Sequence, residues 1–235
     1  MADLSQATAW KPRLANLITF TTLAMAIASI ALSIEGAYRL ACALILTGYL
    51  LDGVDGEVAR RMGGISDFGT QLDSLVDLVH FGVAITVLIS QHLRNGPVGG
   101  WPIWVFLVGY VIAACFRLAR FNLADGNNKQ VTTGLTISTG GAYLTLTVLA
   151  NLGFGQPFVS DWIFLPLLLI VSLLMVSRIP FPDLKGLLHY RVPVLATFGA
   201  GALVSLWLSW EFGLFAMWTV YVLFGTIRAG IRAFD

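Results

Sequence analysis

The chain has 235 residues, of which 57% are hydrophobic and only 11% are charged, and its mean hydropathy is +0.81. This composition excludes an ordinary soluble globular domain and indicates an integral membrane protein. The formal net charge is +1 and the basic residues are spread along the chain, so nothing in the charge supports binding to nucleic acid.

Eight apolar segments predict transmembrane helices, which need roughly 17 to 25 residues each to cross a bilayer. The predicted fold class is therefore an all-α integral membrane protein, a polytopic bundle of about eight helices. The segments are Leu14 to Ile34, Gly36 to Leu51, Leu72 to Ser90, Trp101 to Phe121, Thr133 to Leu152, Trp162 to Val176, Pro193 to Trp210 and Phe212 to Ile231.

The basic residues are unequally divided between the two predicted sides of the membrane. With the N-terminus inside, the inner segments hold twelve Lys and Arg residues, and the outer segments hold only Arg39 and Arg94. Because an excess of basic residues marks the cytoplasmic side, the sequence predicts a multi-pass protein of the cytoplasmic membrane. Both termini are expected on the cytoplasmic side.

Four aspartates lie where the second and third predicted spans meet. They belong to the pattern D-x2-D-G-x2-A-R-x8-G-x3-D-x3-D, whose specified positions are all filled. No polar residue breaks the second span before Asp52, so its helix is expected to continue into the cytoplasm and to carry Asp52 and Asp55. The next helix is expected to carry Asp73 and Asp77 on its first turns. The two helices thus form a polar hairpin.

Residues three or four positions apart share a helix face, so each helix directs one aspartate pair at the same volume. Without counter-ions, four carboxylates gathered at membrane depth would repel one another and would lose their hydration. Oxygen ligands suit hard divalent cations, and we therefore expect Mg2+ or Mn2+ and no structural zinc. Paired divalent cations serve in-line substitution at phosphorus, which predicts a phosphate-bearing substrate.

The residues between the aspartate pairs fit a phosphate ligand. Gly56 and Ala59 lack bulk and let a pyrophosphate approach the helix, whereas Arg60 offers a guanidinium for phosphate oxygens. Gly69 gives the same access from the opposite helix.

The eight-position pattern resembles the signature of the CDP-alcohol phosphatidyltransferase family, membrane enzymes that join a CDP-activated group to an alcohol and release CMP. The resemblance implies a six-helix core with a cytoplasmic site, two metal ions and often a homodimer. By position, it implies that Asp52, Asp55 and Asp73 are metal ligands. It also implies that Asp77 binds metal and takes the proton from the acceptor hydroxyl. The implied cytidine and pyrophosphate contacts are Gly56, Ala59, Arg60 and Gly69.

The first span carries a weaker part of the resemblance. Asn16 and Thr19 are similar to the Pro-Asn-x-x-Thr start of many members, with Ala15 in place of the proline. Both are candidates for contact with the CDP group. The alternative is that they hydrogen-bond a neighbouring helix, as buried Asn and Thr often do in membranes.

Two later segments, Phe116 to Asn122 and Leu174 to Lys185, resemble the phosphatidylserine synthase branch of the family. The resemblance implies a catalytic core over residues 1–186, two additional C-terminal helices over residues 187–235, CDP-diacylglycerol as donor and L-serine as favoured acceptor. The chain departs from the branch at positions that commonly hold proline or, for His80, a small hydroxyl residue. The positions at which proline is common are Ile85, Thr136 and Ser138.

Basic residues at the inner helix ends are candidates for binding the acceptor or a lipid phosphate. They are Arg117, Arg120, Arg178 and Lys185, with His80, one turn beyond Asp77, as a further candidate. Two alternatives stay open: the arginines could extend to anionic headgroups, and His80 could be an interior hydrogen-bonding residue.

Other functions are alternatives to serine transfer. Glycerol 3-phosphate, inositol phosphate and choline are alternative acceptors for the same chemistry. A divalent-cation transporter would need carboxylates continuing across the membrane, whereas Glu35, Asp161 and Glu211 are predicted in outer loops. A structural scaffold would not need small residues at fixed distances from the aspartates.

Overall fold

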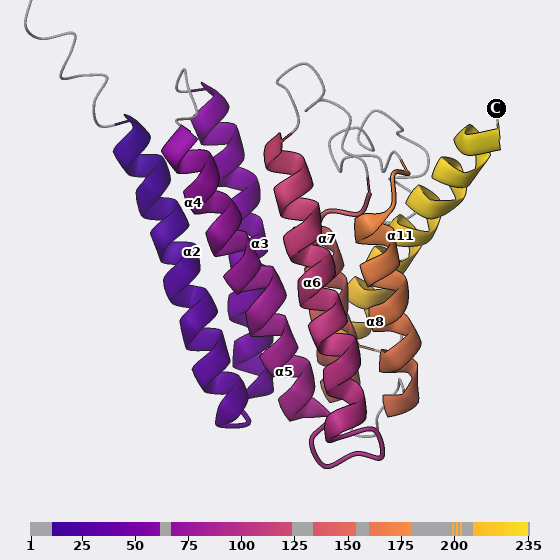
Figure 1. Ribbon diagram of the computed structural model, residues 1–235. Helices are drawn as coiled ribbons and strands as arrows, with labels where there is room; N and C mark the ends of the chain where they lie inside the picture. Colours follow the sequence, from indigo (N-terminus) through magenta and orange to yellow (C-terminus); the bar gives the residue numbers. More distant parts are fainter. Residues whose placement is uncertain are drawn as a thin grey trace, which may run out of the picture.

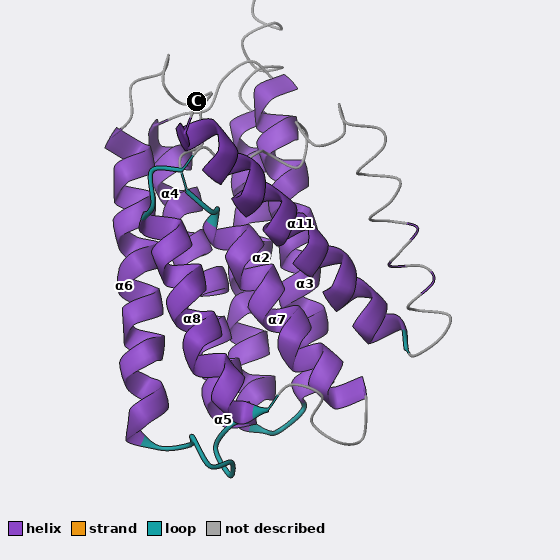
Figure 2. Ribbon diagram, turned by 90° about the vertical axis from the view of Figure 1, so that its right-hand side faces the viewer, coloured by secondary structure: helices purple, strands orange, loops and turns teal. Residues whose placement is uncertain are grey.

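The protein is a bundle of helices that run side by side, with the last helix tilted across the others (Figures 1 and 2). The computed structural model describes residues 11–61, 67–123, 134–153, 160–179 and 209–234, with residues 199, 201 and 203. The side chains of residues 11–15, 54–61, 67 and 227–234 lie outside this description. Helices and short turns make up all of the described residues, and the all-α class is confirmed.

Seven of the eight predicted segments coincide with described helices. One rod is continuous and consists of three parts, α4, η1 and α5. The helices are α2 (Lys11–Ile34), α3 (Tyr38–Arg61), α4 (Asp67–Asp77), the π-helix η1 (Leu78–Val83), α5 (Ala84–His92), α6 (Trp101–Leu123), α7 (Ile137–Gly153), α8 (Asp161–Val176) and α11 (Trp210–Phe234). The predicted span from Pro193 to Trp210 falls almost wholly outside the described residues, so the count of eight stays a prediction.

Within the described part of the chain, three helices are long and apolar enough to cross a membrane by length and composition. They cover Asn16–Ile34, Phe68–His92 and Trp101–Leu123. The α3 helix begins apolar and continues to Arg61, as expected from the lack of a polar break before Asp52. The length of these helices agrees with a membrane protein.

A tight turn at Gly36 joins α2 to α3. Gly36 has a φ of +81°, a conformation that glycine adopts without a steric penalty. The N–H of Ala37 donates to Leu32 O at 2.8 Å, and the N–H of Gly36 donates to Ser33 O at 3.2 Å. This pair of bonds closes the C-terminus of α2 and lets α3 return antiparallel to it.

The centre of the bundle is formed by η1, α5 and α7. Almost every residue of α7 is buried, and its two glycines allow close contact with helices on two sides. A Cβ at Gly141 would lie 2.6 Å from Ile85 Cδ1, and one at Gly140 would lie 2.8 Å from Met175 Cε. These two glycines therefore allow α7 to pack closely against α5 and α8.

The two ends of the bundle differ in chemistry. The start of α2, the end of α3, the start of α4 and the end of α11 lie together at one end (Figure 1). At the other end, Arg39 Nη2 lies 3.8 Å from Glu211 Oε1 and donates to Leu152 O at 2.8 Å. The prediction that Glu211 lies in a loop is wrong: it is buried in the first turn of α11. The charge of Arg39 and the helix N-terminus both stabilise its carboxylate there.

Candidate active site

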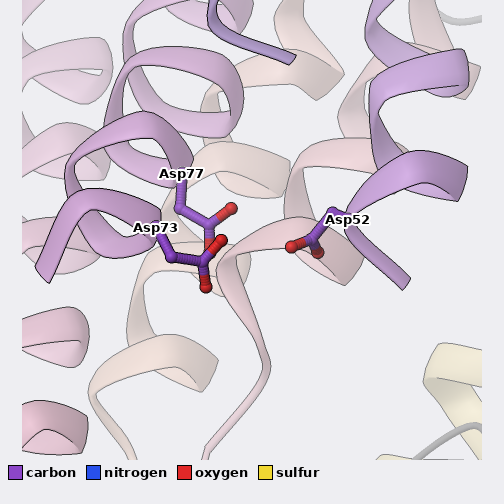
Figure 3. A group of neighbouring side chains, drawn as sticks. All are labelled: Asp52, Asp73 and Asp77. Carbon is purple, nitrogen blue, oxygen red and sulfur yellow. The ribbon is translucent and has the colours of Figure 1, made fainter. Parts of the chain in front are cut away.

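Three carboxylates from two helices face one another at the end of the bundle where α4 begins. Asp52 comes from α3, whereas Asp73 and Asp77 come from successive turns of α4, and all three point into the same space (Figure 3). One oxygen of each lies within 4.8 Å of the others, and all three residues are half-buried. The predicted convergence of the two helices is therefore present for these three residues.

The local sequence explains why the carboxylates meet. Asp73 and Asp77 are four residues apart in α4, so their side chains lie one above the other on one helix face. Asp52 lies in the second half of α3, beyond the apolar residues that pack in the core. Because α3 and the α4 rod run side by side, the two faces meet where both helices become polar (Figure 1).

The donor set fits a divalent metal ion. Three half-buried carboxylates at this separation repel one another, and each has lost part of its hydration. A cation removes that cost, and carboxylate oxygens are the ligands that Mg2+ and Mn2+ prefer. Asp55 lies three residues after Asp52 on α3, but its side chain is outside the described residues, and its part in the site stays a prediction.

Arg117 is the predicted basic residue that the structure brings to the carboxylates. Its side chain projects from α6 and is buried, with 7% of its surface exposed, and its positive charge acts on Asp77 together with the negative charges of Asp52 and Asp73. The guanidinium also lies 5.8 Å from the centre of the Phe121 ring. A fixed cation beside three carboxylates offsets part of their repulsion.

Arg120 contacts the end of α8 instead. Its Nη1 donates to Val176 O at 2.8 Å, and its Nη2 donates to Ser177 O at 3.0 Å and to Met175 O at 3.3 Å. These carbonyls end a helix and lack partners within it, so Arg120 caps α8. Arg178 is exposed just beyond α8, and Lys185 lies outside the described residues.

His80 is fully buried in η1, and both ring nitrogens face backbone carbonyls. Nδ1 lies 3.1 Å from Thr22 O on α2, and Nε2 lies 3.0 Å from Ile45 O on α3. A ring in this position has the geometry of the interior hydrogen-bonding alternative. The role predicted for it in acceptor binding has no support in these contacts.

The residues predicted to contact the CDP group lie on three helices, α2, α3 and α4. Thr19 is buried on α2 and Asn16 is half-buried one turn earlier. Gly69 is half-buried on α4, one turn before Asp73. Gly56, Ala59 and Arg60 belong to the last turns of α3, and their side chains are outside the description. The structure tests none of these roles, and all stay predictions.

Sequence reasoning missed a polar and aromatic group beside Asp52. Tyr49 lies one turn before Asp52 on α3, and its hydroxyl is within hydrogen-bonding reach of the Thr139 side chain. The Trp218 ring of α11 meets the Tyr49 ring edge to face at 5.3 Å, and its Nε1 donates to Thr139 O at 3.2 Å. Spacing in the sequence could not indicate these contacts, because Thr139 of α7 and Trp218 of α11 are far from Tyr49 along the chain.

Comparison with known proteins places the chain in one family. The profile described as CDP-alcohol phosphatidyltransferase matches residues 13–179, which is more than half of the chain. A CDP-diacylglycerol–serine O-phosphatidyltransferase of Mycobacterium leprae is 34% identical over 202 residues, covering 80% of this chain and 66% of that protein. The matched region therefore spans slightly less than two thirds of that relative.

Two other relatives are similarly distant. An archaetidylserine synthase of Methanothermobacter thermautotrophicus is 35% identical over 178 residues, covering 74% of this chain and 71% of that protein. A CDP-diacylglycerol–serine O-phosphatidyltransferase of Helicobacter pylori is 29% identical over 177 residues, covering 72% of each. With the profile match and the carboxylates that α3 and α4 bring together, these similarities show that the chain belongs to the CDP-alcohol phosphatidyltransferase family of enzymes.

Proposed function

We propose that this protein transfers a phosphatidyl group from CDP-diacylglycerol to the hydroxyl of L-serine and releases CMP. The observation that carries the proposal is the convergence of Asp52, Asp73 and Asp77 in a chain of this family. Carboxylates from two helices can fix divalent cations in the arrangement that phosphoryl-group transfer requires.

In this proposal, Asp52, Asp55, Asp73 and Asp77 hold two divalent cations at the end of the bundle. Divalent cations held there would neutralise the donor pyrophosphate and stabilise both the attacking and the leaving oxygen. Gly56, Ala59 and Gly69 leave room for the nucleotide, and Arg60 donates hydrogen bonds to its phosphate oxygens. Asn16 and Thr19, on α2, contribute further contacts to the CDP group.

The chemical step exchanges one phosphorus–oxygen bond for another. Serine Oγ attacks the phosphorus that carries the diacylglycerol group, and the bond from that phosphorus to the CMP oxygen breaks. A carboxylate oxygen of Asp77 accepts the serine hydroxyl proton, which then passes to solvent. Arg117, buried next to Asp77, binds the serine carboxylate or a donor phosphate and orients it for the attack.

The relatives' names support serine as the acceptor. Two are named for transfer to serine from CDP-diacylglycerol, and a third is named for the synthesis of archaetidylserine. These names differ in the lipid part and share serine. The acceptor is therefore the more constant feature among these relatives, and the lipid chain is the more variable one.

The test is CMP release by the purified protein. Protein, CDP-diacylglycerol and Mn2+ or Mg2+ are incubated with serine, glycerol 3-phosphate, inositol phosphate or choline in separate reactions, and the lipid product is identified by mass. We expect CMP release and phosphatidylserine only with serine. Release with another acceptor would replace serine while keeping the reaction class, and no release with any acceptor would contradict the proposal.

We further propose that the protein is a homodimer in the cytoplasmic membrane, with its site and both termini on the cytoplasmic side. The excess of basic residues in the inner segments supports this orientation. The start of α2 and the end of α11 also lie at the same end of the bundle as the carboxylates (Figure 1).

A further inference from the structure

His80 connects three helices close to the carboxylates. The residue is 0% exposed and lies in η1, three positions after Asp77. Its ring reaches the carbonyl of Thr22 on α2 through Nδ1 and the carbonyl of Ile45 on α3 through Nε2. Both partners are acceptors and a neutral imidazole carries a single N–H, so the ring donates to one of the two carbonyls, and in the Nε2–H tautomer that carbonyl is Ile45 O.

The ring is closely enclosed by α3. A Cβ at Gly48 would overlap the His80 ring, so only glycine at this position allows the two helices to approach with the imidazole between them. On the other side of η1, the Tyr110 hydroxyl of α6 donates to Phe81 O at 2.7 Å. The π-helix is therefore fixed by polar contacts from α2, α3 and α6.

The π-helix begins immediately after Asp77. The N–H of Ala84 donates to Val79 O, five residues earlier, which is the wider turn of a π-helix and a feature that is frequent at functional sites. A wider turn rotates the residues before it relative to the residues after it. The directions of Asp73 and Asp77 therefore depend on where η1 is held.

We propose that His80 is a positioning residue for the metal site, because its contact with Ile45 O sets the height and rotation of Asp73 and Asp77 relative to Asp52. Ile45 is seven residues before Asp52 on the same helix, about 10.5 Å along its axis. A slip of one residue between α3 and the α4 rod would move the carboxylates by about 1.5 Å and 100°. Divalent cations tolerate far smaller errors in ligand position.

This inference rests on the proposed function, since it requires that the carboxylates bind divalent cations. It assigns His80 neither to the acceptor nor to chemistry, because the ring is fully buried and both nitrogens face carbonyls. A residue that only fills space would affect folding and leave the metal affinity of the folded protein unchanged. A measurement of metal affinity therefore distinguishes a positioning role of His80 from a role in which the side chain only fills space.

The first experiment compares two amide replacements of His80. In His80→Gln the amide nitrogen takes the place of Nε2 and keeps the bond to Ile45 O on α3. In His80→Asn it takes the place of Nδ1, so it can donate to Thr22 O on α2 and cannot reach Ile45 O. Mn2+ binding to purified protein without substrate is measured by electron paramagnetic resonance. We expect His80→Asn to bind about 10- to 100-fold more weakly than the wild type, and His80→Gln to stay close to it.

Tyr38→Phe is the matched control. The Tyr38 hydroxyl of α3 donates to Gln91 O of α5 at 3.0 Å, so it also links α3 to the α4 rod by a side chain and a backbone carbonyl. This bond lies at the opposite end of both helices from the carboxylates (Figure 1). We expect the variant to lower thermal stability and to leave the Mn2+ dissociation constant unchanged.

A second experiment uses Gly48 and does not depend on the folding of His80→Asn. Gly48→Ala pushes the His80 ring out of place, so it should weaken Mn2+ binding in the wild type. In a His80→Ala background there is no ring to displace, and the same change should add nothing. Such non-additivity shows that the two positions act through one contact.

The outcomes separate this inference from the proposed function. If wild-type protein binds no Mn2+, the proposed function fails and the inference fails with it. If the wild type binds Mn2+ and His80→Asn binds it equally well, only the inference is overturned. Equal effects of Gly48→Ala with and without His80 would overturn it too.

Discussion

Asp77 is surrounded by charges of both signs. It is affected by the negative charges of Asp52 and Asp73 and by the positive charge of Arg117. A carboxylate whose proton affinity is set by competing neighbours is suited to accept a proton during the reaction. These charged neighbours support the proposed role of Asp77 as general base, in addition to its proposed role as a metal ligand.

Asp77→Asn should therefore abolish turnover while the CDP-lipid still binds. The amide keeps an oxygen for the metal but cannot accept the serine proton, and a general base contributes about 10²- to 10⁴-fold to a rate. CMP release gives the rate, and equilibrium binding of CDP-diacylglycerol gives the affinity. Asp161→Asn, at the opposite end of the bundle, is the control and should keep full activity. Full activity in Asp77→Asn would refute the assignment.

Replacing Arg120 should affect the stability of the protein, whereas replacing Arg117 should affect the KM for serine. Arg120→Gln removes the cap from three carbonyls of α8, so it should cost about 1–3 kcal/mol of stability and leave the KM for serine unchanged. Arg117→Gln should raise that KM, because Arg117 lies beside Asp77. Thermal unfolding and initial rates in detergent check both. A raised KM for serine in Arg120→Gln would contradict this expectation and would support a role for Arg120 in binding the acceptor.

The aspartates could be predicted from the sequence, but several of their neighbours could not. Helical spacing alone places Asp73 over Asp77 and carries Asp52 past the apolar part of α3. By contrast, the contacts of Arg120 and His80 depend on how distant helices pack. Arg120 reaches residues more than fifty positions away, and no local pattern distinguishes its cap from a substrate contact.

The α11 helix belongs to the packed core, although the match to the family profile ends at residue 179, before this helix begins. The Phe215 ring stacks on Tyr143 of α7 at 5.7 Å, and Thr219 Oγ1 lies 3.4 Å from the Tyr143 hydroxyl. Trp218 bonds Thr139 O and packs against Tyr49. The helix thereby supports the segment of α3 that carries Asp52.

Trp218→Ala should lower the thermal midpoint because it removes a hydrogen bond and an aromatic contact together. Since Trp218 is only half-buried, the loss should stay below the roughly 3–5 kcal/mol typical of a fully buried tryptophan. Trp162→Ala is the control, because 59% of Trp162 is exposed on α8. Unfolding curves in detergent compare the two. Equal midpoints would show that α11 does not stabilise the core.

Hydropathy predicted the helices well and their irregularities poorly. The segment from Leu72 to Ser90 was expected as one helix, and the structure has one rod with a π-helical turn at Leu78–Val83. A π-turn is stabilised by contacts from outside its own helix, here the Tyr110 hydroxyl and the carbonyls that His80 reaches. Apolar periodicity contains no information about such contacts.

In the whole molecule, the positions of the ends of the described helices agree with an even number of membrane crossings. The α8 helix ends at the carboxylate end of the bundle, where Arg120 caps it, and α11 begins at the opposite end beside Arg39. The eight-helix prediction requires this arrangement. It also requires that Asn95, between α5 and α6, face the outside.

Single-cysteine labelling tests this topology. In a background without Cys42 and Cys115, Asn95→Cys should react with a membrane-impermeant maleimide in intact cells. Leu123→Cys, at the end of α6 and 85% exposed, should react only after the cells are permeabilised. The reverse pattern would place the carboxylates outside the cell.

The most direct test of the central claim is to locate the metal. Crystals or cryo-preserved particles of the protein with CDP-diacylglycerol and Mn2+ would be examined for anomalous or metal density between α3 and α4. We expect two ions bound by the carboxylates of Asp52, Asp55, Asp73 and Asp77, with the donor pyrophosphate beside them. Donor bound elsewhere, with no metal density among these carboxylates, would contradict it.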